Sequence, residues 1–206
     1  GIDVGPDFFN CMLEERNLFS LFYDNVHPNG LGYDYMARLW HSVLDGSATY
    51  SDPCTPPRFI LLNLEPSTTA PYIKQNLIEV GDIYYTDEAF TIGAIPQGIG
   101  LENGIWIMTP NADASNTSDE YISFTVDRTV RVYVAYDIDE SDPAASAPEW
   151  LSGYTDTGLL LPVSDPSAQL QLFQRAFAPG DIVLGGNLAQ GANGADVNYV
   201  VIVVEE

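Results

Sequence analysis

The sequence has few basic residues. Among its 206 residues, Lys and Arg together number 7, against 29 Asp and Glu, so the formal net charge at pH 7 is −22. Proteins that bind nucleic-acid phosphates or anionic membrane surfaces need clustered cations. The composition therefore excludes a nucleic-acid partner and disfavours an anionic membrane. We interpret the acidity as a solvated surface, and the alternative is that some of the carboxylates bind calcium.

Long hydrophobic runs are also absent. No stretch approaches the roughly 20 apolar residues that a membrane-spanning helix needs, so we expect no membrane span. No signal peptide is recognisable either, and residues 1–7 look like the interior of a domain from a longer precursor. Hydrophobic residues nevertheless make up 46% of the chain and aromatic residues 12%. That composition argues against disorder and suffices for one or two cores.

Cysteine occurs only at Cys11 and Cys54. An extracellular protein would allow these two residues to form a disulfide, and closing such a loop stabilises a fold by about 4 kcal/mol in the chain-entropy model. The alternative is a pair of buried thiols in a reducing compartment. The acidic, lysine-poor composition favours the disulfide, and with it a secreted protein.

The chain divides into two unequal parts joined by a short segment. Residues 1–52 are predicted to be helical, because apolar residues recur at three- and four-residue spacing from Leu31 to Leu44 and Asp45-Gly46 ends the helix. Residues 53–80 are predicted to be a linker that continues into an apolar packing segment. Residues 81–206 show short β-type runs separated by turns, so we predict a β domain there.

The β runs predict the fold class. The run from Val130 to Tyr136 alternates in part, with Arg131 facing outward, and the continuous β-branched run from Tyr199 to Val204 predicts a strand covered on both faces. We predict a mainly β chain, an antiparallel β-sandwich resembling a jelly roll, with a helical remnant of an α/β domain at its N-terminus. The predicted strands are 89–95, 104–109, 121–126, 130–136, 159–163, 170–177, 182–184 and 199–204.

Asp24 and His27 form the most specific motif. A serine hydroxyl becomes a nucleophile when a histidine removes its proton, and a carboxylate fixes the tautomer of that histidine. The stretch Asp24–Tyr33, followed by Met36–Trp40, resembles the last sequence block of the SGNH/GDSL hydrolases. The resemblance covers about the first 45 residues. It implies that His27 is the general base, that Asp24 orients it, and that the substrate is an ester, such as an acyl group on a polysaccharide.

The nucleophile of that family is missing from this sequence. In the family, a Gly-Asp-Ser block and the oxyanion donors precede the Asp-x-x-His block, and none of them lies upstream of Asp24. Asp45-Gly46-Ser47 has a different residue order and a different place. We therefore expect esterase activity only together with the missing N-terminal hydrolase portion, on the same precursor or on a separate chain. The alternatives are a non-catalytic binding module and a structural spacer.

The β region resembles the accessory modules of secreted polysaccharide-active enzymes. The residues that carry this resemblance are Tyr84–Asp87, Val132–Asp137 with Pro148–Leu151, and Gly180–Asn187. It implies sugar binding on aromatic platforms, because a pyranose ring has an apolar C–H face. Trp150 and Tyr154 are the candidate platforms. The alternative is that Trp150 closes one end of the core.

No cofactor is required by this interpretation, but calcium has a candidate site. Asp137, Asp139 and Asp142 supply alternating carboxylates in one loop, and calcium takes six to eight oxygen ligands. The loop does not match the EF-hand pattern. A solvated turn is the alternative.

Overall fold

The structure is a computed structural model that describes residues 61–76, 78–138 and 144–206. The chain forms two compact units, Gly1–Ile60 and Leu61–Glu206, and the account below concerns the second. The predicted helical region 1–52 therefore lies outside the described residues. Of the segment predicted as linker and packing region, the part from Leu61 on belongs to the β unit.

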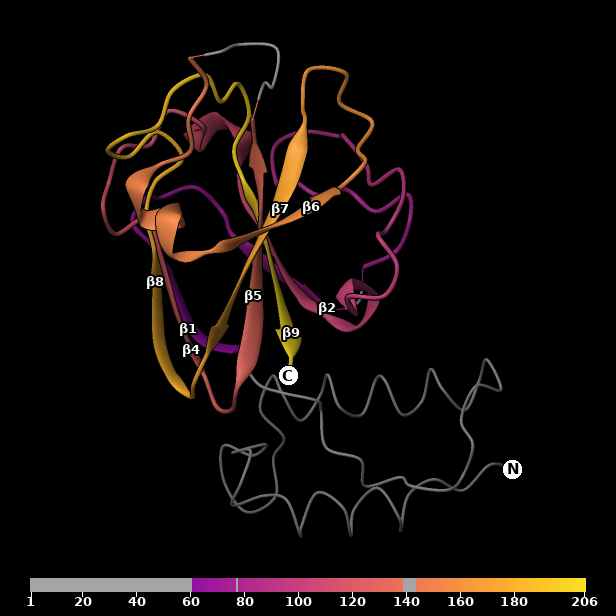
Figure 1. The fold of residues 1–206 in the computed structure, drawn as a ribbon, viewed down its shortest axis with the longest axis vertical. Helices are drawn as coiled ribbons and strands as arrows, with labels where there is room; N and C mark the ends of the chain where they lie inside the picture. The colour runs from indigo at the N-terminus through magenta and orange to yellow at the C-terminus, as the bar shows by residue number, and fades with distance from the viewer. Residues whose placement is uncertain (1–60, 77, 139–143) are drawn as a thin grey trace, which may run out of the picture. The chain divides into compact units, whose positions relative to one another are not determined.

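Two antiparallel sheets make up the described unit, as the sequence predicts. One contains three strands in the order β1–β4–β8, and the other contains six in the order β2–β3–β9–β5–β7–β6 (Figure 1). Short 3-10 turns lie between some of the strands. The strands are β1 Leu61–Pro66, β2 Ile73–Asn76, β3 Ile105–Met108, β4 Ile122–Val126, β5 Val130–Asp137, β6 Thr155–Leu160, β7 Leu170–Phe177, β8 Gly180–Leu184 and β9 Val200–Glu205; the turns are η1 Leu101–Asn103, η2 Asn111–Asp113 and η3 Glu149–Gly153.

Strands β5 and β9 form the centre of the larger sheet. β9 lies between β3 and β5, and β5 pairs on its other side with β7. Apart from Arg131, which is half-buried, every residue of β5 is buried, and the first four residues of β9 are buried as well. β-branched side chains suit a strand that is covered on both faces. The prediction of such a strand at the C-terminal end is confirmed.

The alternation of side chains along β5 and β9 produces two separate cores. Ala135 and Ile202 face a cluster that is closed by the loop between β2 and β3, including Tyr84 and Ile92. That loop covers the side of the larger sheet away from β1, β4 and β8 (Figure 1). The other face of the larger sheet meets the inner face of the smaller one. Fully buried side chains there include Val132, Val134, Val201, Val203, Phe124 and Leu184.

Two predicted strands differ from the structure. The run 89–95 is not a continuous strand; only Thr91 and Ile92 make isolated bridges, because the segment crosses the sheet face as a covering loop and buries Ile92. The predicted strand 159–163 is displaced toward the N-terminus and appears as β6, while Val163 keeps a single bridge to Ile92.

A buried amide ties the loops at one end of the sheets together. Asn198 is 0% exposed, and its Nδ2 donates to the carbonyl oxygen of Pro110 at 2.8 Å and to the hydroxyl of Tyr121 at 2.9 Å. Its Oδ1 accepts from the backbone N–H of Tyr199 at 3.0 Å. A buried polar side chain is tolerated only when its groups are paired in this way. Asn198 therefore links the loop before η2 to the start of β9.

The same network extends through a carboxylate. Asp113 Oδ2 accepts hydrogen bonds from the hydroxyls of Thr68 at 2.7 Å, Tyr72 at 2.8 Å and Tyr121 at 3.3 Å. The hydroxyl oxygens of Tyr72 and Tyr121 also lie in contact with each other. Residues from two connections, one between β1 and β2 and one between β3 and β4, thus meet at one carboxylate, which holds this end of the sandwich together.

Replacing Asn198 by Ala should lower the free energy of unfolding by about 3 kcal/mol, because it leaves the backbone N–H of Tyr199 buried without its acceptor and removes the side-chain hydrogen bonds to the Pro110 carbonyl and the Tyr121 hydroxyl. Chemical denaturation monitored by circular dichroism measures the change. Asn193→Ala is the matched control, since Asn193 is exposed and donates to the carbonyl of Ala144. Equal effects of the two substitutions would contradict the importance of the buried network.

Alkaline pH should unfold the protein cooperatively. Burial raises the pKa of many tyrosine hydroxyls in the described unit, whereas an unfolded tyrosine ionises near pH 10. The unfolded state then loses protons that the folded state keeps, so the contribution of these tyrosines to stability is constant below about pH 10 and falls above it. The tyrosines concerned are Tyr72, Tyr84, Tyr85, Tyr121, Tyr133, Tyr136, Tyr154 and Tyr199.

Tyrosinate absorbance and near-ultraviolet circular dichroism, followed together during a pH titration, test this expectation. The tyrosinate signal should rise in the same pH range in which the tertiary signal disappears. Ionisation of all the tyrosines near pH 10 with an unchanged tertiary signal would contradict it.

Candidate functional site

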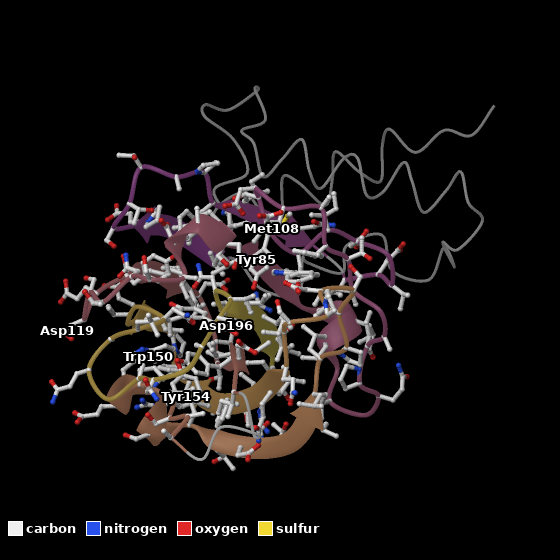
Figure 2. All side chains as sticks on the ribbon, turned by 90° about the horizontal axis from the view of Figure 1, so that it is seen from above. Tyr85, Met108, Asp119, Trp150, Tyr154 and Asp196 are labelled. Carbon is white, nitrogen blue, oxygen red and sulfur yellow. The ribbon has the colours of Figure 1, made fainter. Side chains whose placement is uncertain are left out.

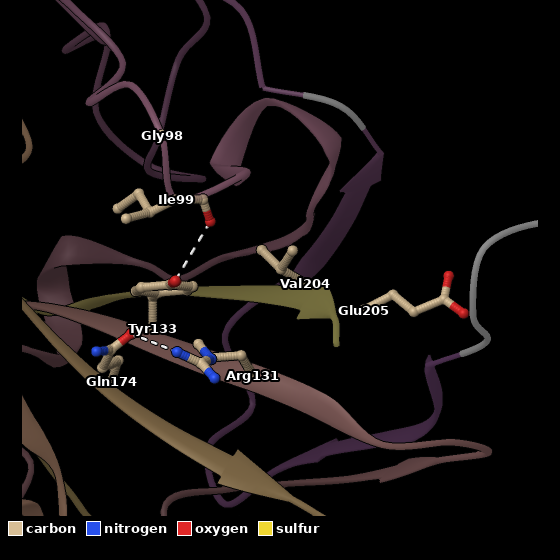
Figure 3. A pocket seen from close by; sticks show the side chains of 7 residues that line it. All are labelled: Gly98, Ile99, Arg131, Tyr133, Gln174, Val204 and Glu205. Atoms are coloured by element: carbon tan, nitrogen blue, oxygen red, sulfur yellow. Dashed lines mark hydrogen bonds between the residues drawn. The ribbon is translucent and has the colours of Figure 1, made fainter.

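A depression of about 300 Å³ lies on the six-stranded sheet, where β5, β7 and β9 are neighbours. The strand register creates it: Tyr133 pairs with Gln174 on one side, and Arg131 pairs with Val204 on the other. Neighbouring residues on paired strands project from the same face of a sheet. The lining residues are Gly98, Ile99, Arg131, Tyr133, Gln174, Val204 and Glu205 (Figure 3).

Tyr133 provides a fixed floor for this depression. The side chain is 2% exposed, and its hydroxyl donates to the carbonyl oxygen of Ile99 at 3.2 Å (Figure 3). Burial raises the pKa of the Tyr133 hydroxyl, so the group stays protonated and keeps this bond at neutral pH. The loop carrying Gly98 and Ile99 is thereby attached to the sheet.

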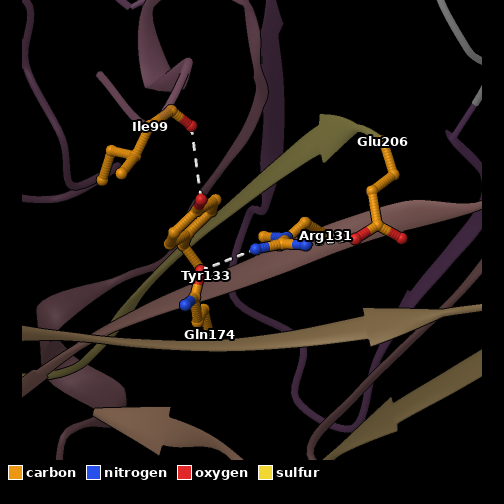
Figure 4. A network of polar contacts seen from close by, with 5 residues as sticks. All are labelled: Ile99, Arg131, Tyr133, Gln174 and Glu206. Carbon is orange, nitrogen blue, oxygen red and sulfur yellow. Dashed lines mark hydrogen bonds and ion pairs between the residues drawn. The ribbon is translucent and has the colours of Figure 1, made fainter. Parts of the chain in front are cut away.

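Arg131 supplies the positive charge. Its Nη1 donates to Gln174 Oε1 at 3.2 Å, and its Nη2 contacts the carboxylate of Glu206 (Figure 4). The hydrogen bond to Glu206 raises the pKa of the Arg131 guanidinium further. The side chains of Arg131 and Glu206 are 37% and 34% exposed, so this ion pair lies at the surface, and solvent reaches it.

Glu205 has a different partner. Its Oε1 accepts from Arg128 Nη1 at 3.0 Å, and Figure 3 shows its carboxylate directed away from Arg131 and Tyr133. The depression therefore offers a guanidinium, a carboxamide and the apolar side chains of Ile99 and Val204. Its seven lining residues include no Ser, Cys or His, so the arrangement suits binding of a polar ligand rather than nucleophilic catalysis.

Sequence reasoning found only part of this site. Partial alternation along β5 predicts that Arg131 faces outward, and the structure confirms it. Gln174 and the loop at residues 98–99 were missed, since nothing local in the sequence says that β7 lies beside β5. The weak available signal was a basic residue within an otherwise apolar strand of a very acidic chain.

The predicted platform residues Trp150 and Tyr154 lie together, with ring centroids 5.9 Å apart and an interplanar angle of 86° (Figure 2). Trp150 also packs on the buried ring of Tyr199 at 5.4 Å, and its Nε1 donates to the carbonyl of Gly186 at 3.0 Å. A Cβ atom at Gly185 would come within 2.4 Å of the indole. Trp150 is half-buried and closes the core at this point, so the structure gives it the packing role that the sequence left as the alternative.

Two further side chains join this aromatic cluster. Arg175 Cζ lies 4.9 Å from the ring centroid of Phe177 and 5.9 Å from that of Tyr154, within the range of cation–π contact. The Tyr154 hydroxyl is buried and has no hydrogen-bond partner within the described residues. A ligand role for Trp150 and Tyr154 stays a prediction.

Asp137, the first of the predicted calcium ligands, is 3% exposed. Its Oδ1 accepts from the backbone N–H of Gln169 at 2.8 Å, and its Oδ2 accepts from that of Asp196 at 2.9 Å. Each carboxylate oxygen thus joins β5 to another loop. Asp139 and Asp142 lie outside the described residues. Within those residues, no three His, Cys, Asp or Glu side chains are arranged to hold a metal ion, and calcium binding stays a prediction.

The predicted catalytic pair Asp24 and His27 and the predicted disulfide Cys11–Cys54 also lie outside the described residues, so both stay predictions. Among the helices of the described part, none is long and apolar enough to cross a membrane.

No protein-family model and no curated protein matches the sequence. Among solved structures, a β-glucuronidase from glycoside hydrolase family 2 matches 69% of this chain with a TM-score of 0.59 and 23% identity. The match spans 14% of the length of that enzyme. A GH138 enzyme targeting pectin rhamnogalacturonan II matches 84% of this chain and 20% of its own, with a TM-score of 0.43 and 16% identity.

The resemblance of residues 1–45 to the SGNH/GDSL hydrolases stays a prediction. At 23% identity, the match to the β-glucuronidase shows the fold alone. The described unit is thus a β-rich sandwich whose fold occurs as one part of a larger carbohydrate-active enzyme.

Proposed function

We propose that the unit Leu61–Glu206 is a non-catalytic carbohydrate-binding accessory module and that the depression between β5, β7 and β9 is its saccharide site. The observation that carries this proposal is the lining itself, in which Arg131 and Gln174 lie beside the apolar side chains of Ile99 and Val204. The occurrence of the same fold inside a β-glucuronidase fits this function.

A sugar ring has the chemistry that this lining would recognise. A pyranose presents an apolar face of C–H groups and a rim of hydroxyls, which need apolar contact and directional hydrogen bonds respectively. Val204 and Ile99 offer the apolar contact, while the guanidinium of Arg131 and the carboxamide of Gln174 offer donors and an acceptor. A volume of about 300 Å³ lies at the small end of ligand sites and suits one or two sugar residues.

Gln174→Ala should weaken saccharide binding about tenfold. It removes one group that would bond the sugar directly, and it removes the hydrogen bond that holds the Arg131 guanidinium. Affinity electrophoresis through gels containing individual polysaccharides measures the effect as lost retardation. The matched control is Gln190→Ala, since Gln190 is exposed, bonds Glu149 and does not line the depression.

The same gels test the aromatic cluster. Trp150→Ala should reduce thermal stability, because the indole packs on Tyr199, and should keep the retardation of the folded protein. Lost retardation with a native circular dichroism spectrum would instead place the ligand at Trp150 and Tyr154. Absence of retardation on every polysaccharide would overturn the binding function and favour a structural spacer.

We also propose a catalytic role for the N-terminal motif, based on its sequence. Asp24 and His27 would serve as the orienting carboxylate and the general base of an SGNH/GDSL ester hydrolase whose serine lies outside these 206 residues. The substrate would be an ester, such as an acyl group on a polysaccharide that the β unit holds.

The catalytic proposal predicts a large effect of His27→Ala. In the protein combined with its serine-bearing hydrolase portion, this substitution should lower kcat on a short-chain nitrophenyl ester by about 10³-fold or more, because the serine loses its base. His41→Ala, at the second histidine of the sequence, is the control and should leave kcat unchanged. Equal activity of the His27 variant and the parent protein would refute the assignment.

A further inference from the structure

We propose that the depression selects saccharides that carry a carboxylate, such as uronic acids, and that Glu206 occupies Arg131 until such a ligand displaces it. This inference rests on the proposed carbohydrate-binding function and names the ligand class of the same site. The observation that motivates it is the contact between the Arg131 guanidinium, which lines the depression, and a carboxylate of the same chain (Figure 4).

The Arg131 guanidinium is oriented so that it can bind a second carboxylate in place of Glu206. Gln174 Oε1 accepts from Nη1 at 3.2 Å, which restrains the group, while Nη2 is the nitrogen that contacts Glu206. An arginine presents its N–H groups in a planar fork that matches a carboxylate. The structure therefore shows that the Arg131 guanidinium binds a carboxylate while its hydrogen bond to Gln174 is present.

Glu206 is a weak competitor. Both side chains of the pair are more than one third exposed, and ion pairs in contact with water contribute little to stability. A saccharide carboxylate would replace the interaction with Glu206 and would add contacts from its ring to Ile99 and Val204. The exchange would cost the protein little, whereas a neutral sugar would gain nothing from the charge of Arg131.

The distribution of charge in the chain favours binding of an acidic ligand at Arg131. The chain carries 29 acidic and 7 basic residues, so an anionic ligand is repelled unless a cation meets it directly. Of the basic side chains in the described unit, Arg128 pairs with Asp127 and Glu205, and Lys74 donates to the carbonyl of Leu61. Arg175 lies over Phe177 in the aromatic cluster. Arg131 is the cation that lines the depression.

Isothermal titration calorimetry with matched ligands tests the inference. The probes are uronate-containing oligosaccharides, each paired with its carboxyl-reduced, neutral form, at one fixed ionic strength. For at least one pair the acidic form should bind about tenfold tighter or more, as expected for a charge-assisted hydrogen bond. Arg131→Gln should remove this difference between the paired ligands.

Glu206→Gln is the more specific variant, because it removes the competitor and leaves the depression intact. It should tighten binding of the acidic form by up to about fivefold and leave binding of the neutral form unchanged. Arg175→Gln removes a cation that does not line the depression and is the control; both affinities should stay as in the parent protein.

The outcomes separate this inference from the proposed function. Equal binding of both members of every pair would overturn the ligand class while leaving a carbohydrate-binding module. No binding of any member would overturn the module itself. A preference for the acidic form that survives Arg131→Gln would place the site elsewhere, and a Glu206→Gln variant with unchanged affinity for the acidic form would overturn the competition.

Discussion

The pairing of β5 with β9 is the constraint on which the rest of the described structure depends. β9 joins β3 to β5, and β5 in turn carries β7. The two central strands are covered on both faces, so their side chains belong to two cores at once. Loss of this pairing would expose both cores together. The smaller sheet packs on one face of β5 and β9 and the loop between β2 and β3 packs on the other, so both would lose the surface against which they are buried.

The candidate site follows from the same pairing. Arg131 and Tyr133 project from β5 toward the face that the covering loop only partly closes, and the register sets Gln174 and Val204 beside them. The hydrogen bond from the Tyr133 hydroxyl to the Ile99 carbonyl attaches the loop to the sheet, and the loop covers the sheet at that point. The depression lies next to this attachment, so its wall is loop and its floor is rigid sheet. Such a support holds a guanidinium at low entropic cost.

Hydrogen-bonded polar groups fix the loops at the end of the sandwich where β5 ends and β9 begins. Asn198 and Asp113 collect hydrogen bonds from several loops at one place, and Asp137 receives two backbone N–H groups at another. Although the chain is rich in carboxylates, Asp113 and Asp137 therefore act as hydrogen-bond acceptors within the fold rather than as surface charge. The aromatic cluster around Trp150 has the corresponding apolar role, since its rings close the core beside Tyr199.

The sequence by itself determined the mainly β class, the burial on both faces of the strand at 199–204, the long strand at 170–177 and the outward direction of Arg131. These are local properties, because burial on one or both faces leaves a periodic pattern in the residues of a single strand. Tertiary structure alone decided that the segment 89–95 covers the sheet instead of joining it, and that Tyr133 and Gln174 lie side by side. Strand order and register are set by contacts between residues far apart in the chain, and no local pattern encodes which strand will be the neighbour.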